Sequence, residues 1–265
     1  MTSRNPIYLY CLEIHLTSHC NIACKGCSQS SPLMQERLQS IEQLQQTLDK
    51  LKNTISCSKL QILGGEPLLH PELLDAMRVC DASPLSENLV VKTNGLLLHK
   101  VSPDFWRLAS KVIVSVYPST KRAIEKRRKS IEAAANHQGT ELEFRYWTHF
   151  NHITKPNRTE SERITNHVFA NCRYKDFTVS ISGDRLFRCS ISVNSIRTHM
   201  AGELPDSISI TDAENLEQEV WDFLTSQTPI SSCRYCLGSS GAQFKHRTLK
   251  PTDRHTPVML DDYYR

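Results

Sequence analysis

Apolar, β-branched segments alternate with segments of helical periodicity through the first half of the chain. Strands are predicted over residues 8–17, 59–63, 88–93, 111–117 and 141–147. Helices are predicted over residues 36–53, 70–80 and 119–137, with a short helix opening at Ser102. Such alternation indicates βαβ units and a parallel sheet, which right-handed crossovers curl into a barrel. The predicted fold class is therefore α/β, a partial (β/α) barrel with mostly parallel strands.

The pattern changes after residue 150, where a second unit is predicted. Residues 151–171 are polar and are expected to form a linker or the last barrel elements. Strands at 177–181 and 185–189 flank Gly183 and predict a β-hairpin, and residues 212–227 predict a helix. We therefore expect a core over 1–150, a small cysteine-rich hairpin-and-helix domain over 172–245, and a polar tail over 246–265.

Composition narrows the classes of protein that need to be considered. The 265 residues carry 32 basic and 28 acidic side chains, a balance that gives no indication of nucleic-acid binding. No apolar run approaches the roughly 20 residues of a membrane span, and no secretory signal is visible, so a cytoplasmic location is expected. Ten cysteines are numerous for such a chain. Because the cytosol keeps thiols reduced, they are expected to bind metal or react rather than form disulfides.

Three cysteines follow the first predicted strand with C-x3-C-x2-C spacing, at Cys20, Cys24 and Cys27. Thiolates are the usual ligands of iron–sulfur clusters, and three on one loop can hold three irons of a [4Fe–4S] cluster. The fourth iron is then free to bind a small molecule. Zinc remains an alternative, because His19 would supply the fourth ligand that a structural zinc site needs.

Four further cysteines lie in the second half of the chain, at Cys172, Cys189, Cys233 and Cys236. The first two flank the predicted hairpin, and the last two form C-x2-C. Four thiolates suit either a fully ligated [4Fe–4S] cluster or a structural zinc ion, and spacing does not separate the two.

The cysteine triad resembles the hallmark of the radical S-adenosylmethionine (SAM) superfamily. Two further segments match in order, Gly-Gly-Glu-Pro at 64–67 and Thr-Asn-Gly at 93–95, both at the ends of predicted strands. Carboxyl ends of barrel strands form the face where active sites assemble. The resemblance implies that the cofactor is held by Gly64, Gly65, Glu66, Pro67, Thr93 and Asn94. One departure stands out: Gly26 precedes the third cysteine, where the family usually has an aromatic residue near the adenine.

The resemblance also implies the chemistry. A cluster electron cleaves SAM, and the resulting 5′-deoxyadenosyl radical removes a hydrogen atom from an unactivated C–H bond. Reduced flavodoxin or ferredoxin is the implied electron donor. Related enzymes bind the SAM carboxylate or ribose with a polar residue and an arginine from later strands, which points to Ser115 and Arg145. Pairing of Arg145 with a neighbouring strand residue is the equal alternative. The basic run over 121–129 predicts a solvated helix face, with docking of an acidic electron donor as the alternative.

The second cysteine set resembles the twitch domain, a shortened SPASM domain that holds one auxiliary cluster. Length, hairpin placement and cysteine order are most similar to the radical SAM dehydrogenases of aminoglycoside biosynthesis, which oxidise 2-deoxy-scyllo-inosamine. The resemblance therefore implies two [4Fe–4S] clusters and SAM as cofactors. It also implies oxidation of a small polar metabolite such as a sugar or cyclitol, with the auxiliary cluster as electron acceptor.

Three alternatives remain open on sequence grounds. An epimerase would need a cysteine hydrogen donor, for which Cys11 on the first strand is the candidate, whereas Cys57 and Cys80 are expected to be buried thiols. An enzyme acting on a ribosomally made peptide is the second alternative. A zinc-stabilised binding module without enzymatic activity is the third. Histidines just past the fifth strand, His149 and His152, would line a substrate cavity in any of the enzymes.

Overall fold

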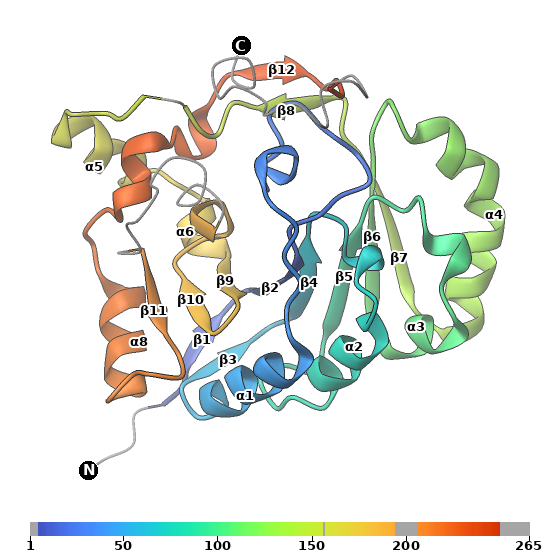
Figure 1. Cartoon of the computed structure of the whole chain (residues 1–265), viewed down its shortest axis with the longest axis horizontal. Helices are drawn as coiled ribbons and strands as arrows, with labels where there is room; N and C mark the ends of the chain where they lie inside the picture. Colours follow the sequence, from blue (N-terminus) through green and yellow to red (C-terminus); the bar gives the residue numbers. More distant parts are fainter. Residues whose placement is uncertain (1–4, 156, 194–205, 250–265) are drawn as a thin grey trace.

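A single eight-stranded sheet forms the centre of the computed structural model, which describes residues 5–155, 157–193 and 206–249 (Figure 1). Its strands, in the order β11-β10-β9-β2-β4-β5-β6-β7, are β11 (Ser207–Ser209), β10 (Arg185–Phe187), β9 (Val179–Ser182), β2 (Leu12–Thr17), β4 (Leu60–Gly64), β5 (Leu89–Thr93), β6 (Lys111–Val116) and β7 (Glu141–Tyr146). Neighbours from β9 to β7 are parallel, and β10 and β11 add antiparallel strands at one edge. The predicted α/β partial barrel with mostly parallel strands is confirmed.

Helices connect the parallel strands and lie outside the sheet. They are α1 (Ile41–Leu51), α2 (Leu73–Asp81), α3 (Pro103–Leu108) and α4 (Lys121–Gln138). The three helices with predicted ranges, α1, α2 and α4, all begin later than predicted, and local polar contacts define the start of the first two. Ser40 caps α1 by accepting a hydrogen bond from the amide of Gln43, and His70 Nδ1 accepts one from the amide of Glu72 in the turn before α2. α4 ends at Gly139, whose φ of 74° is the left-handed conformation of many helix C-caps.

The prediction of one strand over residues 8–17 is wrong. The chain instead forms β1 (Ile7–Leu9), breaks at Tyr10, and continues as β2. β1 pairs in parallel with β3 (Ile55–Cys57), a short strand that the sequence analysis missed, while β2 pairs with β4 and β9. A continuous apolar run does not show where the chain changes its hydrogen-bonding partners. The strand is broken here because β1 and β2 pair with different strands.

The second half of the chain contains more regular structure than predicted. The expected linker over 151–171 includes α5 (Glu162–Ala170), which is capped by Ser161, and follows the short strand β8 (His149–Asn151). β8 pairs antiparallel with β12 (Gln243–Lys245), and the remaining helices are α6 (Tyr174–Phe177) and α8 (Leu216–Thr225). The predicted hairpin is confirmed as β9–β10, with φ of 65° at Gly183. Because β9 is hydrogen-bonded to β2, the hairpin extends the core sheet, and the domain boundaries remain predictions.

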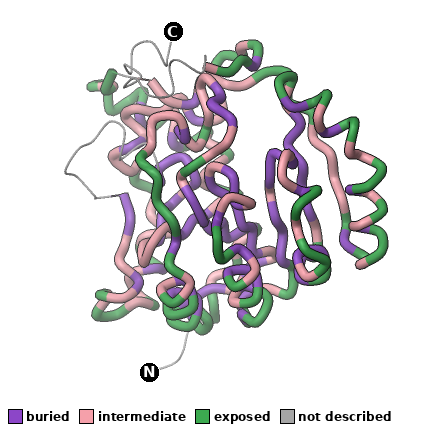
Figure 2. The backbone as a smooth tube through the Cα atoms, turned by 45° about the vertical axis from the view of Figure 1, so that its right-hand side comes forward, coloured by how far each residue is buried: buried purple, intermediate pink, exposed green. Residues whose placement is uncertain are grey.

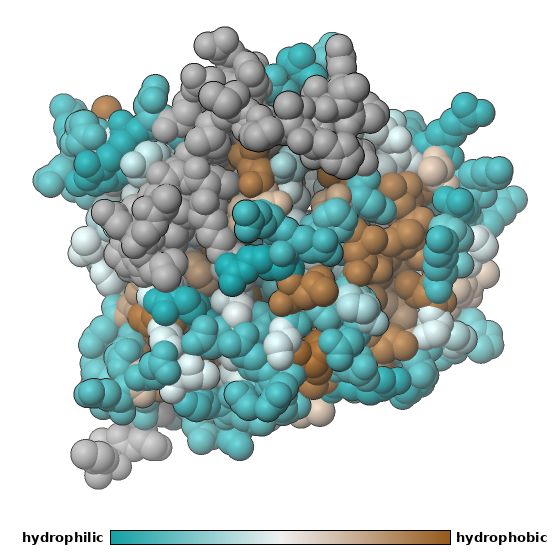
Figure 3. Space-filling model, viewed as in Figure 1, coloured by the Kyte–Doolittle hydropathy of each residue, from teal (hydrophilic) through white to brown (hydrophobic). Residues whose placement is uncertain are grey.

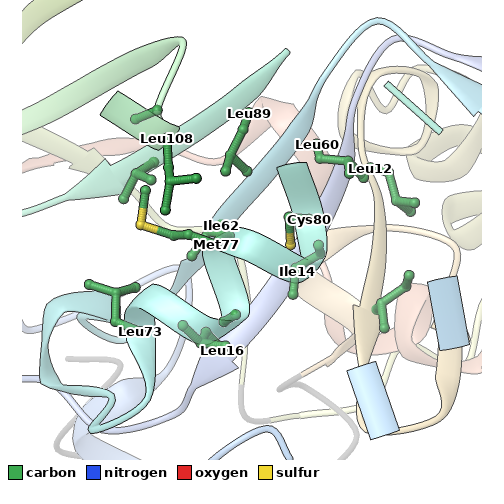
Figure 4. Close-up of a cluster of buried hydrophobic side chains, with 14 of the residues drawn as sticks. Leu12, Ile14, Leu16, Leu60, Ile62, Leu73, Met77, Cys80, Leu89 and Leu108 are labelled. Atoms are coloured by element: carbon green, nitrogen blue, oxygen red, sulfur yellow. The ribbon is translucent and has the colours of Figure 1, made fainter. Parts of the chain in front are cut away.

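The main core lies between the sheet and its covering helices. Leu12, Ile14 and Leu16 of β2 belong to the same buried cluster as Met77 and Cys80 of α2 (Figure 4). Buried residues follow the strands through the interior, whereas exposed residues follow the outer helices (Figure 2). Because side chains alternate along a strand, the residues between these apolar ones point to the opposite face, the barrel interior.

Hydrophilic side chains cover much of the molecular surface in the view of Figure 3. Within the described ranges, no helix is both long enough and apolar enough to span a membrane.

Candidate cluster and cofactor site

A cavity at the carboxyl ends of the central strands contains the three cysteines of the C-x3-C-x2-C motif. It is lined by Cys20, Ile22, Cys24, Cys27, Ser28, Gln29, Leu63, Gly64, Gly65, Lys92, Thr93, Asn94, Ser115, Tyr117 and Phe150. Of the eight predicted cofactor residues, five line this cavity, namely Gly64, Gly65, Thr93, Asn94 and Ser115, whereas Glu66, Pro67 and Arg145 do not. The structure therefore brings the cysteine motif together with residues from β4, β5 and β6.

The glycine pair at the end of β4 lies directly against the backbone that leads into the cysteine loop. A Cβ atom added to Gly64 would lie 2.2 Å from the carbonyl oxygen of Thr17, and one added to Gly65 would lie 2.0 Å from that of His19. The amide of Gly65 donates to Thr17 O at 2.7 Å, and the amide of Glu66 donates to His19 O at 2.8 Å. Only glycine permits this approach, and the hydrogen bonds fix the loop relative to the sheet.

Glu66 does not line the cavity but stabilises the turns around it. Its fully buried carboxylate accepts hydrogen bonds from Thr93 Oγ1 at 2.6 Å, from the amide of Asn94 at 2.7 Å and from the amide of Leu68 at 3.1 Å. Burial raises the pKa of Glu66 to about 7, against the opposing effect of these donors. The carboxylate thus connects the end of β5 to the turn after β4. Gly64 and Gly65, which have no side chains, line the cavity with their backbone atoms.

Two hydrogen-bond donors lie close to the sulfur of Cys20. The amide of Ile22 lies 3.5 Å from Cys20 Sγ, and Asn94 Nδ2 lies 3.9 Å from the same sulfur while donating to Asn21 Oδ1 at 2.6 Å. The hydroxyl of Ser115 lines the cavity, is buried, and has no hydrogen-bond partner of normal geometry in the part of the chain that the structure describes. A buried donor without a partner suits a polar ligand in the cavity.

The three thiols suit an iron–sulfur cluster. Burial raises the pKa of Cys20 to about 12 and raises the pKa of Cys24 and Cys27 as well, so these thiols are protonated until a metal displaces the proton. Over the described ranges, no three His, Cys, Asp or Glu side chains converge closely enough to hold one metal ion. Cysteines that surround a cavity, rather than meeting at a point, fit a cluster whose irons lie at separate corners.

The other four cysteines line a second cavity near α6 and the end of β10, together with the cationic side chains of Lys175 and Arg188. The four are Cys172, Cys189, Cys233 and Cys236. Burial raises the pKa of Cys189 to about 11 and that of Cys236 to about 12. The carboxylate of Asp206 accepts hydrogen bonds from the amides of Ser231 and Ser232, both at 2.5 Å, which holds the loop before Cys233. Four thiols beside two cations fit an anionic thiolate-ligated group.

The barrel interior contains a polar cluster that was not predicted from the sequence. Glu13 on β2 is buried, and its carboxylate accepts hydrogen bonds from Gln61 Nε2 at 3.0 Å and Ser180 Oγ at 3.4 Å. Burial raises the pKa of Glu13, and the nearby Lys92 opposes that rise. His15, two residues further along β2, lies 3.2 Å from Ser190 Oγ through Nε2. The only sequence signal was the alternation of Glu13 and His15 with apolar residues in one strand.

Several predicted residues lie elsewhere. Arg145 on β7 forms an ion pair with Glu143, at 2.5 Å from Nε to Oε1, and does not line the cysteine cavity, so the structure favours the strand-pairing alternative. Cys11 is buried at the amino end of β2 and is not part of the cavity lining. His149 is exposed on β8. Within the predicted basic run, Arg128 pairs with Glu132 on the surface of α4.

Part of the chain is similar to a known protein family. Residues 14–120 match the model of the radical SAM superfamily. It is 30% identical over 106 residues to a GTP 3′,8-cyclase of Crocosphaera subtropica, covering 38% of this chain and 32% of that protein. It is 32% identical over 90 residues to the GTP 3′,8-cyclase of Chlorobaculum tepidum, covering 34% of this chain and 27% of that protein. The matches thus span about a third or less of these relatives.

Solved structures extend the similarity of fold beyond the matched domain. The crystal structure of BtrN in complex with AdoMet and 2-DOIA aligns with a TM-score of 0.53 and 14% identity, covering 84% of each chain. At this identity, the alignment shows a shared fold that includes the second half of the chain. The twitch-like character of that half remains a prediction.

Proposed function

We propose that this protein is an enzyme that reductively cleaves SAM and removes a hydrogen atom from a small polar metabolite, which it oxidises. In this proposal Cys20, Cys24 and Cys27 hold the catalytic [4Fe–4S] cluster. An auxiliary [4Fe–4S] cluster, held by the second set of four cysteines, accepts an electron. Reduced flavodoxin or ferredoxin supplies the first electron, and the enzyme works in the cytoplasm.

The observation that carries the proposal is a polar network between the two cysteine cavities. Gln29 lines the first cavity and donates through Nε2 to Ser190 Oγ at 3.1 Å. Ser190 also contacts His15, and the adjacent residue, Cys189, lines the second cavity. Lys92, Glu13 and Gln61 continue this network through the barrel interior. Such a set of charged and amide groups suits a substrate rich in hydroxyl or amino groups.

The chain's own residues define what the site does. When bound, the cluster and SAM supply hydrogen-atom abstraction from an unactivated C–H bond. The backbone of Gly64 and Gly65 and the side chain of Ser115 would bind and orient the cofactor. The polar network would orient the substrate through Gln29 and Lys92, its two members that line the cysteine cavity.

In this proposal Glu13, which belongs to the same polar network, accepts the proton that such an oxidation releases. A two-electron oxidation of an alcohol carbon to a carbonyl removes one hydrogen atom, one proton and one further electron. The hydrogen atom would pass to the SAM-derived fragment, the electron would pass to an auxiliary cluster held by the second set of cysteines, and the proton would pass to the Glu13 carboxylate. Burial raises the pKa of Glu13, which makes its carboxylate a stronger base than an exposed one.

Metal analysis of anaerobically reconstituted protein tests the proposal. The wild type is expected to hold about eight irons per chain, and a Cys172→Ala/Cys189→Ala variant about four. Both should form 5′-deoxyadenosine from SAM under dithionite, because the catalytic cluster is retained. A Cys57→Ala variant is the matched control, since Cys57 is a buried thiol that donates to Leu85 O, and it should keep the wild-type iron content.

Two outcomes would contradict the proposal in different ways. Four irons in both proteins would leave the oxidation without its electron acceptor. Zinc without iron, with no SAM cleavage, would rule out the enzyme and favour a metal-stabilised binding module.

A further inference from the structure

A segment near the C-terminal end of the described chain lies directly on the catalytic cysteine loop. We call residues 243–249 the strap. β12 begins the strap and pairs with β8, above the carboxyl ends of the central strands in the view of Figure 1. Beyond β12, the amide of Lys25 donates to Arg247 O at 2.9 Å, and the amide of Leu249 donates to Ala23 O at 2.8 Å. These two backbone hydrogen bonds lie on either side of Cys24.

The loop is shaped to receive the strap at Gly26. This residue has φ of +65°, and a Cβ atom added to it would lie 2.4 Å from Cζ of Phe244. Phe244 also packs against Phe150, with ring centroids 6.2 Å apart, and Phe150 lines the cysteine cavity. The absence of a side chain at position 26 therefore leaves room for an aromatic ring from the strap.

His246 is the strap residue that reaches a cysteine. It is buried, and its Nε2 lies 3.2 Å from Cys24 Sγ. The ring is held on two sides: it stacks on Tyr117, with centroids 4.9 Å apart and planes at 15°, and meets Phe150 edge-on at 4.8 Å. Nδ1 is buried without a hydrogen-bond partner in the described ranges, so the contact with Cys24 is the polar contact of this ring.

We propose that His246 is a positioning residue of the catalytic cluster, donating an Nε2–H hydrogen bond to the thiolate of Cys24. The inference rests on the proposed function, because it takes Cys24 as a cluster ligand. A metal-bound thiolate has no proton and only accepts, so the imidazole is the donor. Hydrogen bonds to cluster sulfurs stabilise the reduced, more negative state and raise the reduction potential. The strap thus controls how easily the catalytic cluster accepts its electron.

Potentiometry of the reconstituted full-length protein, followed by electron paramagnetic resonance, tests the inference. The cluster signal that changes on addition of SAM identifies the catalytic cluster. His246→Leu, which fills the space but cannot donate, is expected to shift its potential to a more negative value. His246→Gln, which retains an N–H donor, should restore most of that shift. His149→Leu, which removes an exposed histidine from β8, should match the wild type. Equal potentials in the wild type and His246→Leu, or equal shifts in the Leu and Gln variants, would overturn the inference.

Isotope labelling tests the same hydrogen bond in the unaltered protein. With ¹⁵N-histidine incorporated, the reduced SAM-responsive cluster should show a weak ¹⁵N hyperfine coupling that His246→Gln abolishes. Absence of that coupling in the wild type would overturn the inference even if the variants fail to fold. If instead Cys24→Ala leaves a SAM-responsive cluster signal intact, the proposed function itself is wrong, which is a distinct result.

Discussion

Single residues at the cluster site are constrained by contacts that leave almost no freedom of substitution. Gly65 has no room for a side chain, because the backbone of the cysteine loop occupies the position of a Cβ atom. Glu66 is constrained electrostatically, since three donors surround a carboxylate with no access to water. Both residues act on the geometry of the loop, and substitutions should therefore change cluster loading or folding before they change any chemical step.

Gly65→Ala should displace the cysteine loop, because the new methyl would lie 2.0 Å from the carbonyl oxygen of His19. We expect a loss of roughly 1–3 kcal/mol in the free energy of unfolding and a marked fall in bound iron. Gly139→Ala is the comparison: its φ is positive, at +74°, unlike that of Gly65, and nothing lies within 4 Å of its Cβ position. Metal analysis and denaturant unfolding check both variants, and normal iron content in Gly65→Ala would show that the loop tolerates the displacement.

Glu66→Gln should change how stability depends on pH. Because burial raises the pKa of Glu66 from 4.5 to about 7, the folded state binds this proton more tightly than the unfolded chain does. Glu66 therefore makes the free energy of unfolding fall as pH rises between those values, by about 3 kcal/mol in total. The variant lacks this contribution, and the difference between the two proteins, measured by urea unfolding from pH 4.5 to 8, should follow that window. The exposed Glu87→Gln should show no such difference.

At the scale of elements, the site is assembled where strand ends meet loops from distant parts of the sequence. β4, β5 and β6 supply the floor of the cavity, and Phe150 of β8, against which the strap residue Phe244 packs, is part of its aromatic lining. Parallel strands place all their carboxyl ends at one edge of the sheet, so residues far apart in the chain meet there. The strap reaches this edge by pairing with β8, not through a continuation of the β/α alternation.

Phe244→Ala should loosen the strap from the cysteine loop. Removal of the ring leaves a gap above Gly26 and costs roughly 2 kcal/mol of stability for this half-buried side chain. In cluster-free protein, the buried thiol of Cys24 should then react faster with iodoacetamide, as followed by mass spectrometry of its peptide. Phe177→Ala is the comparison, because that exposed ring meets Tyr10 edge-on and does not line the cavity that contains Cys24. An unchanged rate at Cys24 in Phe244→Ala would mean that the backbone hydrogen bonds alone hold the strap.

At the scale of the whole molecule, one sheet connects the two cysteine cavities. β9 pairs with β2 next to the polar interior, and the chain beyond β10 carries the loops around the second cavity. These edge strands are short, with three or four residues each, although Val179, Ile181 and Leu186 join the same main core as β4, β5 and β6. We therefore expect the bound metal group to contribute more to the stability of these edge strands than to the stability of the central strands.

Removal of both clusters should weaken the edge of the sheet selectively. Hydrogen exchange compared between reconstituted and cluster-free protein should show lost protection in residues 172–189 and 230–238, with β4, β5 and β6 still protected. The physical reason is that metal-ligand bonds would cross-link the loops that carry Cys172, Cys189, Cys233 and Cys236. Uniform loss of protection across the sheet would indicate that the clusters stabilise the molecule as one cooperative unit.

Local sequence determined the parts of this protein whose interactions span few residues. The C-x3-C-x2-C loop, the glycine pair after β4, the amphipathic helices and the β9–β10 hairpin could all be predicted, because spacing, periodicity and turn chemistry act over a few positions. The radical SAM fold follows from these features in their order along the chain.

Tertiary structure alone decided which distant segments meet. The break between β1 and β2, the burial of Glu13 beside Ser180, and the contact between His246 and Cys24, 222 positions apart, have no local signature. Each depends on register and burial in the assembled sheet, since a strand's partners and the face it turns inward are fixed only when the whole sheet packs. For the same reason, the sequence shows only that Gly26 replaces an aromatic residue. The fold shows that the missing side chain at this position leaves the space that the ring of Phe244 occupies.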